Sequence, residues 1–231
     1  DFPLNKCCDE RNSFQSPIDI PVSHRTYRVR NKLRYRRSHI KGKVENNGLY
    51  PKFKPEDGNI KLYGVPKSRR SYILDNVHIH FGPRGDDRQT EHTIGGKNFD
   101  AEYDLHIMSY ETLTYYLVRQ LDEVTEFDNE GKHAEKIYLN PNELLSESAI
   151  YYYYEGSLTS PTCTEAVTWL VAEEPTRISD ETVILYDAGG IFAPYIIYTN
   201  KGNLRPTQSL AGRKVKKLRF RKRKYNNRRD D

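Results

Sequence analysis

Alternating apolar and polar residues dominate the sequence and predict a protein built mainly from β-strands. Successive side chains of a strand point to opposite faces, so a half-buried strand alternates with a period of two. Alternation, or clustering of β-branched and aromatic residues, occurs at 27–30, 32–36, 77–81, 104–108, 167–171, 183–186 and 195–198. Turn-forming pairs such as Asn47-Gly48 and Asp57-Gly58 separate these segments.

Helical spacing is rare. Leu117, Leu121 and Val124 fall on one face of a helix, which predicts a helix over 114–125. Residues 142–146 favour a short helical turn. The expected fold class is therefore mainly β (α+β), with a few short peripheral helices.

Charge is distributed unevenly along the 231 residues, whose formal net charge is +5. Residues 213–231 hold eleven Lys and Arg and two Asp, and 25–43 hold nine Lys and Arg and no acid. Outside 213–231 there are 26 basic and 30 acidic residues. We expect one domain over 1–212 and a basic tail over 213–231 that is too charged to pack after Leu218. The two basic runs suggest an acidic partner (acidic protein, sulfated glycan, carbonate mineral or nucleic acid), or else two solvated faces.

Two histidines two residues apart, His78 and His80, lie in an alternating segment and so share one face of a strand. His106 lies in another alternating segment that could pair with the first. Three neutral imidazoles with one open coordination position describe a catalytic zinc site. The His-x-His spacing alone is weak evidence for a metal site, because surface histidines also show this spacing.

Six motifs in order make the sequence resemble the α-class carbonic anhydrases from residue 15 to residue 213. They are Gln15-Ser-Pro-Ile-Asp-Ile20, Asn46-Asn-Gly48, Val77-His-Ile-His-Phe-Gly82, Glu91-His-Thr93, the run 154–169, and Asn203-Leu-Arg-Pro206 with Gly212-Arg213. The resemblance implies a single domain on a large, twisted, mostly antiparallel central sheet. Residues 53–57 resemble secreted, nacrein-like members of molluscan shell matrix.

The resemblance implies that Zn²⁺ is bound by His78, His80 and a third ligand that can be assigned in two ways. A loop two residues longer than the family's makes His106 the ligand and Asp104 its hydrogen-bond acceptor. An ungapped alignment instead makes Asp104 the ligand and Glu102 its supporting carboxylate. We expect His106, because three imidazoles leave the zinc its full charge.

The same resemblance implies the supporting residues and the reaction. Asn76 would orient His78, and the Asn203 backbone carbonyl would orient His80. Thr159 and Glu91 would orient the attacking oxygen. The expected reaction is the reversible hydration of carbon dioxide to bicarbonate, and the implied substrate-binding residues are Leu158, Ser160, Val167 and Trp169.

The sequence departs from the family in two places. Leu49 stands where fast members have a histidine that exports protons, so a slow enzyme is expected. The family's long segment after the third ligand is almost missing between Tyr110 and Leu117. Either a central strand is lost, or the natural chain has further residues here.

The three cysteines are too few for a disulfide scaffold. Within the resemblance, Cys163 matches a cysteine that secreted members join to one near the N-terminus; Cys8 is the expected partner and Cys7 the alternative. A disulfide would indicate an oxidising, extracellular location, and the leftover cysteine could link two chains. A second hypothesis is a non-catalytic relative that binds acidic matrix, glycan or mineral through its basic segments.

Overall fold

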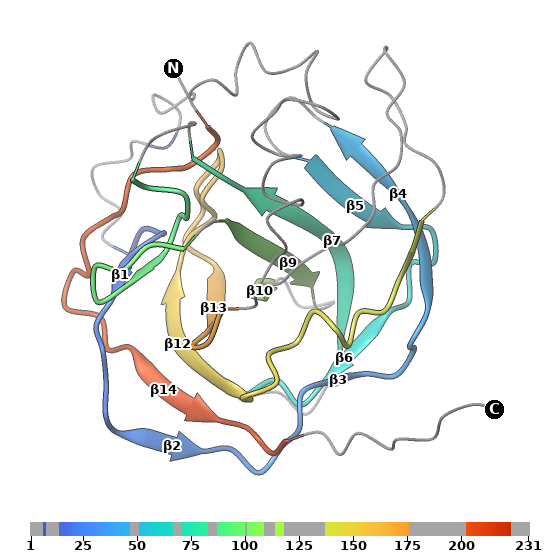
Figure 1. Cartoon of the computed structure of the whole chain (residues 1–231), viewed down its shortest axis with the longest axis horizontal. Helices are drawn as coiled ribbons and strands as arrows, with labels where there is room; N and C mark the ends of the chain where they lie inside the picture. Colours follow the sequence, from blue (N-terminus) through green and yellow to red (C-terminus); the bar gives the residue numbers. More distant parts are fainter. Residues whose placement is uncertain are drawn as a thin grey trace.

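A single large β-sheet organises the chain. The structure is a computed structural model that describes residues 7, 14–46, 51–66, 71–82, 87–99, 101–108, 114–117, 137–175 and 202–222. Ten strands follow one another across the sheet (Figure 1) in the order β11 (Ile137–Leu139), β4 (Ile40–Asn46), β5 (Pro51–Pro55), β7 (Tyr72–His80), β9 (Glu102–Met108), β10 (Thr114–Leu117), β13 (Val167–Ala172), β12 (Ile150–Gly156), β14 (Lys216–Arg219) and β2 (Thr26–Arg28).

The remaining described strands are short. β3 (Arg34–Tyr35) pairs with β6 (Lys61–Tyr63), which pairs with β7. β1 (Asp19–Ile20) and β8 (Thr93–Ile94) form a separate two-stranded parallel sheet. In the main sheet, β10–β13 and β14–β2 are parallel and the other pairs are antiparallel. The mostly antiparallel central sheet is thus confirmed.

Both faces of the sheet are covered, and each has its own apolar cluster. One cluster includes Val77 and Ile79 of β7 and Leu105 of β9. The other, on the opposite face, includes Trp169 of β13 and Tyr154 of β12. Burial on both faces explains why β12, with its four consecutive tyrosines, shows no alternation by which the sequence could have revealed it.

The helix predicted over 114–125 is wrong for its first residues, since Thr114–Leu117 form strand β10. β10 pairs with β9 on one side and with β13 on the other, so the central sheet continues without a gap. Of the two alternatives left open for this segment, the loss of a central strand is therefore not what the structure shows. Residues 118–125 lie outside the described residues, as do the strands predicted at 183–186 and 195–198.

Residues 142–146 form hydrogen-bonded turns, with the Glu143 N–H donating to the Asn140 carbonyl, and no helix occurs in the described ranges. Accordingly, the described part of the chain contains no helix of the length and apolarity that a membrane span requires. The few peripheral helices expected from the sequence are not found among these residues.

The C-terminal basic segment is part of the sheet. β14 pairs with β12 and β2, and Leu218 and Phe220 are buried at 7% and 3% exposure. The expectation that packing ends after Leu218 is therefore wrong, because Phe220 is also buried. Alternate apolar side chains at 218 and 220 allow a highly charged segment to bury one face.

Candidate metal centre

Three ligating side chains converge on the face of the sheet opposite Val77 and Ile79. His78 and His80 project from β7, and Asp104 projects from β9 directly opposite His78 in the strand register. The Asp104 Oδ2 lies 3.6 Å from His78 Nε2 and 3.7 Å from His80 Nε2. Their ligand atoms all lie within 4.8 Å of one another, and all three residues are buried. This geometry could hold a metal ion.

Hydrogen bonds at the far side of each imidazole fix the orientation of the two histidines. His78 Nδ1 lies 2.9 Å from Asn76 Oδ1, and His80 Nδ1 lies 3.3 Å from the Asn203 carbonyl oxygen. With Nδ1–H donated to an oxygen, each Nε2 keeps its lone pair toward the shared centre. Asn76 and Asn203 thus lie where the family resemblance implies them.

His106 does not join the pair. It lies opposite Asn76, one pleat further along β9, and its Nδ1 is 3.1 Å from both Asp75 Oδ2 and Asn76 Nδ2. The structure therefore groups Asp104, not His106, with His78 and His80 as donors that could hold a metal ion, and the His106 imidazole contacts Asp75 and Asn76 instead of Asp104. The strand pairing of His78 with Asp104 agrees with the ungapped alignment to the family, which makes Asp104 the third ligand.

Burial and neighbouring charge set the protonation of the donors. Burial, followed by the charges of Glu102 and Glu91, raises the pKa of Asp104 well above its usual range. Burial, followed by the positive charges of His80 and His106, lowers the pKa of His78 well below its usual value. His78 is thus held neutral, which is the form that binds metals, and a cation would displace a proton from Asp104.

A buried network behind the centre involves His92, which the sequence analysis did not single out. Glu102 Oε2 accepts the His92 backbone N–H at 2.6 Å, and the other Glu102 oxygen contacts His92 Nδ1. His92 Nε2 lies 2.6 Å from the Tyr154 hydroxyl. Burial alone would raise the pKa of Glu102, but the charge and hydrogen bonds of His92 lower it overall. The Glu91-His92-Thr93 motif was the sequence feature from which His92 could have been identified.

Thr159 and Glu91 are both buried, at 5% and 0% exposure. Glu91 Oε1 accepts the Arg205 backbone N–H at 2.9 Å and lies 3.5 Å from His80 Nδ1. Glu91 Oε2 accepts no hydrogen bond from any residue that the structure describes. The Thr159–Glu91 contact implied by the resemblance is therefore not formed here, although Glu91 is close to the centre.

Of the implied substrate-binding residues, Val167 and Trp169 are buried in the second apolar cluster, and the half-buried Leu158 packs against it. The Trp169 ring also contacts the His92 ring, with centroids 4.7 Å apart and ring planes tilted by 59°. Ser160 is half-buried, and its carbonyl accepts the Cys163 N–H. The structure thus brings an apolar wall next to the network that supports the centre.

The disulfide joins Cys163 to Cys7, not to Cys8. This corrects the expected partner and ties the N-terminal segment to the loop after β12. Cys8 and Leu49 lie outside the described residues.

The donor set fits a divalent metal. Asp104 is fully buried, yet neither carboxylate oxygen accepts a hydrogen bond within the described part of the chain. A buried carboxyl group without hydrogen bonds is costly unless it meets a cation. Two imidazoles and one carboxylate with room for a solvent ligand form one of the donor sets that bind catalytic zinc.

Comparison with known proteins decides the family. The model of eukaryotic-type carbonic anhydrases matches residues 4–120 and 114–219. This chain belongs to that family. The two matched ranges overlap at residues 114–120.

Relatives of this carbonic anhydrase include a putative carbonic anhydrase 1 of Lottia gigantea, 29% identical over 321 aligned positions that cover 96% of this chain and 78% of that protein. Carbonic anhydrase 1 of Oryctolagus cuniculus is 30% identical, covering 87% of this chain and 97% of that one. Among solved structures, the α-carbonic anhydrase of Thermovibrio ammonificans, in complex with sulfanilamide, has a TM-score of 0.66 at 24% identity, covering 94% of this chain and 88% of that one. That likeness supports the fold.

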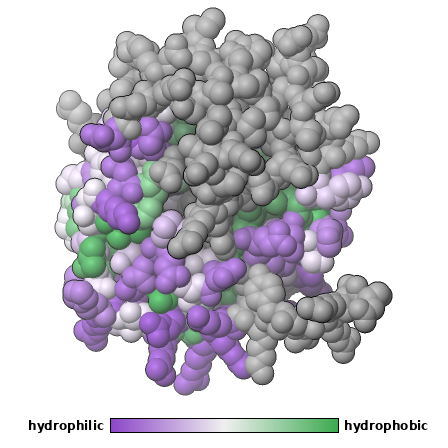
Figure 2. Space-filling view, viewed as in Figure 1, coloured by the Kyte–Doolittle hydropathy of each residue, from purple (hydrophilic) through white to green (hydrophobic). Residues whose placement is uncertain are grey.

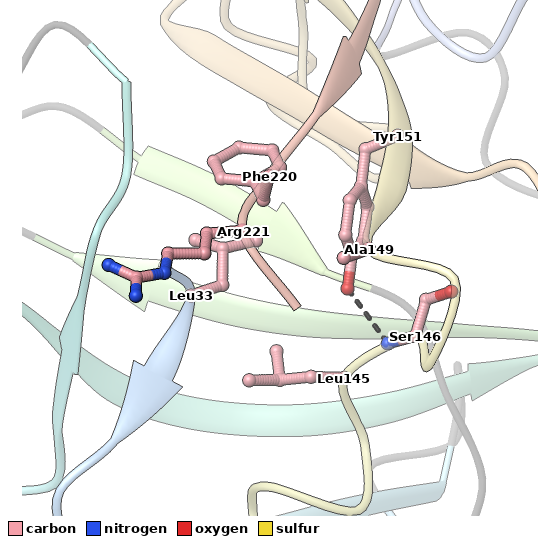
Figure 3. A pocket seen from close by; sticks show the side chains of 7 residues that line it. All are labelled: Leu33, Leu145, Ser146, Ala149, Tyr151, Phe220 and Arg221. Carbon is pink, nitrogen blue, oxygen red and sulfur yellow. Dashed lines mark hydrogen bonds between the residues drawn. The ribbon is translucent and has the colours of Figure 1, made fainter. Parts of the chain in front are cut away.

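The structure also contains a small cavity (Figure 3). Mainly apolar side chains line it: Leu33, Leu145, Ser146, Ala149, Tyr151, Phe220 and Arg221. The Ser146 N–H donates to the Tyr151 hydroxyl at 2.8 Å, and the Arg221 guanidinium points away from that bond (Figure 3). None of the candidate metal ligands lines this cavity.

Proposed function

We propose that this carbonic anhydrase binds zinc through His78, His80 and Asp104 and reversibly hydrates carbon dioxide to bicarbonate and a proton. The observation that carries the proposal is the convergence of these three donors on adjacent strands of a chain that belongs to the family. A bound zinc ion would supply a Lewis acid that lowers the pKa of a water molecule from 15.7 to about 7 in the best cases.

Residues of the chain orient the metal ligands, accept a hydrogen bond and surround the substrate. Asn76 and the Asn203 carbonyl hold the imidazoles with Nε2 toward the centre. The Glu91 carboxylate lies beside His80, and its Oε2 accepts no hydrogen bond from the described residues, so we propose that it accepts the hydrogen bond of the Thr159 hydroxyl during the reaction. Leu158, Val167 and Trp169 exclude water and give carbon dioxide an apolar surface.

We propose that turnover is slow, for two reasons. A carboxylate donor cancels one positive charge, so less charge remains to stabilise hydroxide than in a three-imidazole site. Leu49 cannot carry a proton to solvent. The extracellular location and a role in matrix or biomineralisation are part of the same proposal, supported by the Cys7–Cys163 disulfide. A link between two chains through Cys8 also remains a proposal.

Paired alanine variants test the ligand set. Asp104→Ala should weaken zinc affinity by more than about 100-fold, because it removes a donor, whereas the loss of a residue that only orients a ligand costs roughly 10–100-fold. His106→Ala, two residues along the same strand face, should change zinc affinity less than about threefold. Competition with a chelator measures both affinities without relying on activity. Equal losses in the two variants, or a larger loss in His106→Ala, would overturn the assignment.

Stopped-flow hydration of carbon dioxide by the zinc-loaded protein, with and without a sulfonamide, tests the activity. We expect turnover that the sulfonamide blocks. Asp104→His, which restores three imidazoles, should raise turnover near neutral pH. Stoichiometric zinc with no turnover would instead favour the second candidate, a non-catalytic binding protein, which the carboxylate at the third ligand position makes worth testing.

A further inference from the structure

Parts of the two basic runs, residues 26–31 and 217–221, lie side by side at one edge of the sheet. β2 pairs in parallel with β14, and Arg28 is directly opposite Arg219. The pairing continues beyond the strands, because the Val29 N–H donates to the Arg219 carbonyl and the Arg221 N–H donates to the Asn31 carbonyl. Figure 2 shows hydrophilic side chains gathered along the lower edge of the molecule, where Figure 1 places β2 and β14.

Four exposed arginines define this basic edge: Arg28, Arg30, Arg219 and Arg221. Leu218 and Phe220 turn into the core, so the arginines at 219 and 221 point outward on alternate positions. Two arginines directly opposite in a ladder repel each other. The fold nevertheless brings them together at its edge strand.

Carboxylates neutralise neighbouring basic residues but not this edge. Asp57 pairs with Arg37, Glu56 contacts Lys41, and Glu173 pairs with Lys217. No ion pair to a carboxylate is found for the four arginines among the residues that the structure describes. Their charge is therefore available to an external anion.

The shape and chemistry of the basic edge fit a linear polyanion with oxyanion groups. Guanidinium groups bind sulfate and carboxylate oxygens through two parallel hydrogen bonds. Two paired strands present them in two rows, about 4.8 Å apart, with about 6.6 Å between alternate residues of a row. An extended chain of regularly spaced anions can follow such rows.

Nucleic acid fits less well. Single-stranded nucleic acid needs exposed aromatic rings for base stacking. Near this edge Tyr27 is 42% exposed, but the Arg25 guanidinium covers its ring at 4.9 Å. Reading a major groove needs a helix or a protruding two-stranded ribbon, whereas β2 and β14 are built into the large sheet.

We propose that the basic edge formed by β2 and β14 binds a linear sulfated polysaccharide. The edge lies five strand spacings from β9, about 24 Å along the sheet. The proposal does not depend on zinc or on catalysis, and a bound polysaccharide would leave the metal centre open.

Heparin is the probe, and titration calorimetry of the disulfide-bonded protein at two salt concentrations is the measurement. Wild-type protein should bind heparin, with affinity that falls as salt rises. Arg28→Ser with Arg219→Ser should weaken binding at least about tenfold. The matched control, Lys54→Ser with Lys97→Ser, removes two exposed positive charges elsewhere and should weaken it less than about threefold. Equal losses would overturn the proposal.

Two further comparisons isolate the surface and the ligand. A chain that ends at Lys222 lacks the basic residues at 223–231, and the same substitutions are made in it. If this truncation alone abolishes heparin binding, the proposal is contradicted. Heparin should compete better than desulfated heparin, polyaspartate or single-stranded DNA of equal length, and a preference for any of these would also contradict it. If the first double variant fails to fold, Arg30→Ser with Arg221→Ser replaces it, since both residues lie outside the strands.

Discussion

At the residue scale, either of two side chains on the same face of β9 could supply the third donor of the candidate metal centre. Asp104 and His106 are two positions apart, so strand periodicity assigns both to the face of His78 and His80. An irregularity in the β7–β9 pairing between Leu74 and Asn76 leaves His106 beside Asp75. The register between β7 and β9 therefore decides which side chain lies beside the two histidines. The sequence alone does not distinguish two registers that differ by two residues.

Arg205 shows how a buried charge at the residue scale joins distant segments. Its side chain donates to the Ser16 carbonyl at 2.7 Å and to Gln15 Oε1 at 2.8 Å, while its backbone N–H reaches Glu91. We predict that Arg205→Met lowers the free energy of unfolding by about 3 kcal/mol, because buried acceptors lose a charged donor. Urea denaturation measures the change. The exposed Arg36→Met should cost less than about 0.5 kcal/mol, and an equally small effect at 205 would contradict the prediction.

At the scale of elements, pairing overrides local pattern. Residues 114–117 begin a segment with helical spacing, yet they form β10 because β9 and β13 both offer unpaired backbone groups there. In the interior of a sheet those groups must be paired. β14 is a second example, since its charged residues flank the buried Leu218, and the buried Phe220 follows the strand directly.

A proline in β10 tests whether this segment is a central strand. Tyr116 pairs with His106 on one side and with Trp169 on the other. Tyr116→Pro should lower the free energy of unfolding by at least about 3 kcal/mol, because proline removes a ladder donor and is excluded from central strands. Tyr116→Val, which keeps the backbone donor and the strand preference, is the control. Urea titrations in which the two variants unfold alike would argue against the strand.

At the scale of the whole molecule, two apolar clusters cover the two faces of the sheet, and the Cys7–Cys163 disulfide adds a covalent link. The clusters lie on opposite sides of the same strands, so the metal centre sits on a sheet supported from behind by the first cluster and beside it by the second. The Cys7–Cys163 disulfide spans 156 residues and ties the N-terminal segment to the loop after β12.

Removing that disulfide should be costly. In the loop-entropy model a closed loop of this length contributes roughly 5 kcal/mol, so we predict that Cys163→Ser lowers the free energy of unfolding by about 3–5 kcal/mol. Cys8→Ser should have almost no effect and should remove the free thiol that a thiol-reactive reagent detects in the unfolded protein. If Cys8→Ser is the destabilising change, the pairing with Cys7 is wrong.

The sequence by itself determined the mainly β architecture, the family motifs, His78 and His80 on one strand face, and the uneven charge. These depend on periodicity and on the order of residues, which are local properties. Only the tertiary structure decided that Asp104 and not His106 lies beside His78 and His80, that 114–117 is a central strand, that Cys7 is the bonded cysteine and that parts of two remote basic runs form one edge. Each depends on which strand lies beside which and in what register, and that is set by the burial of both faces of the sheet at once.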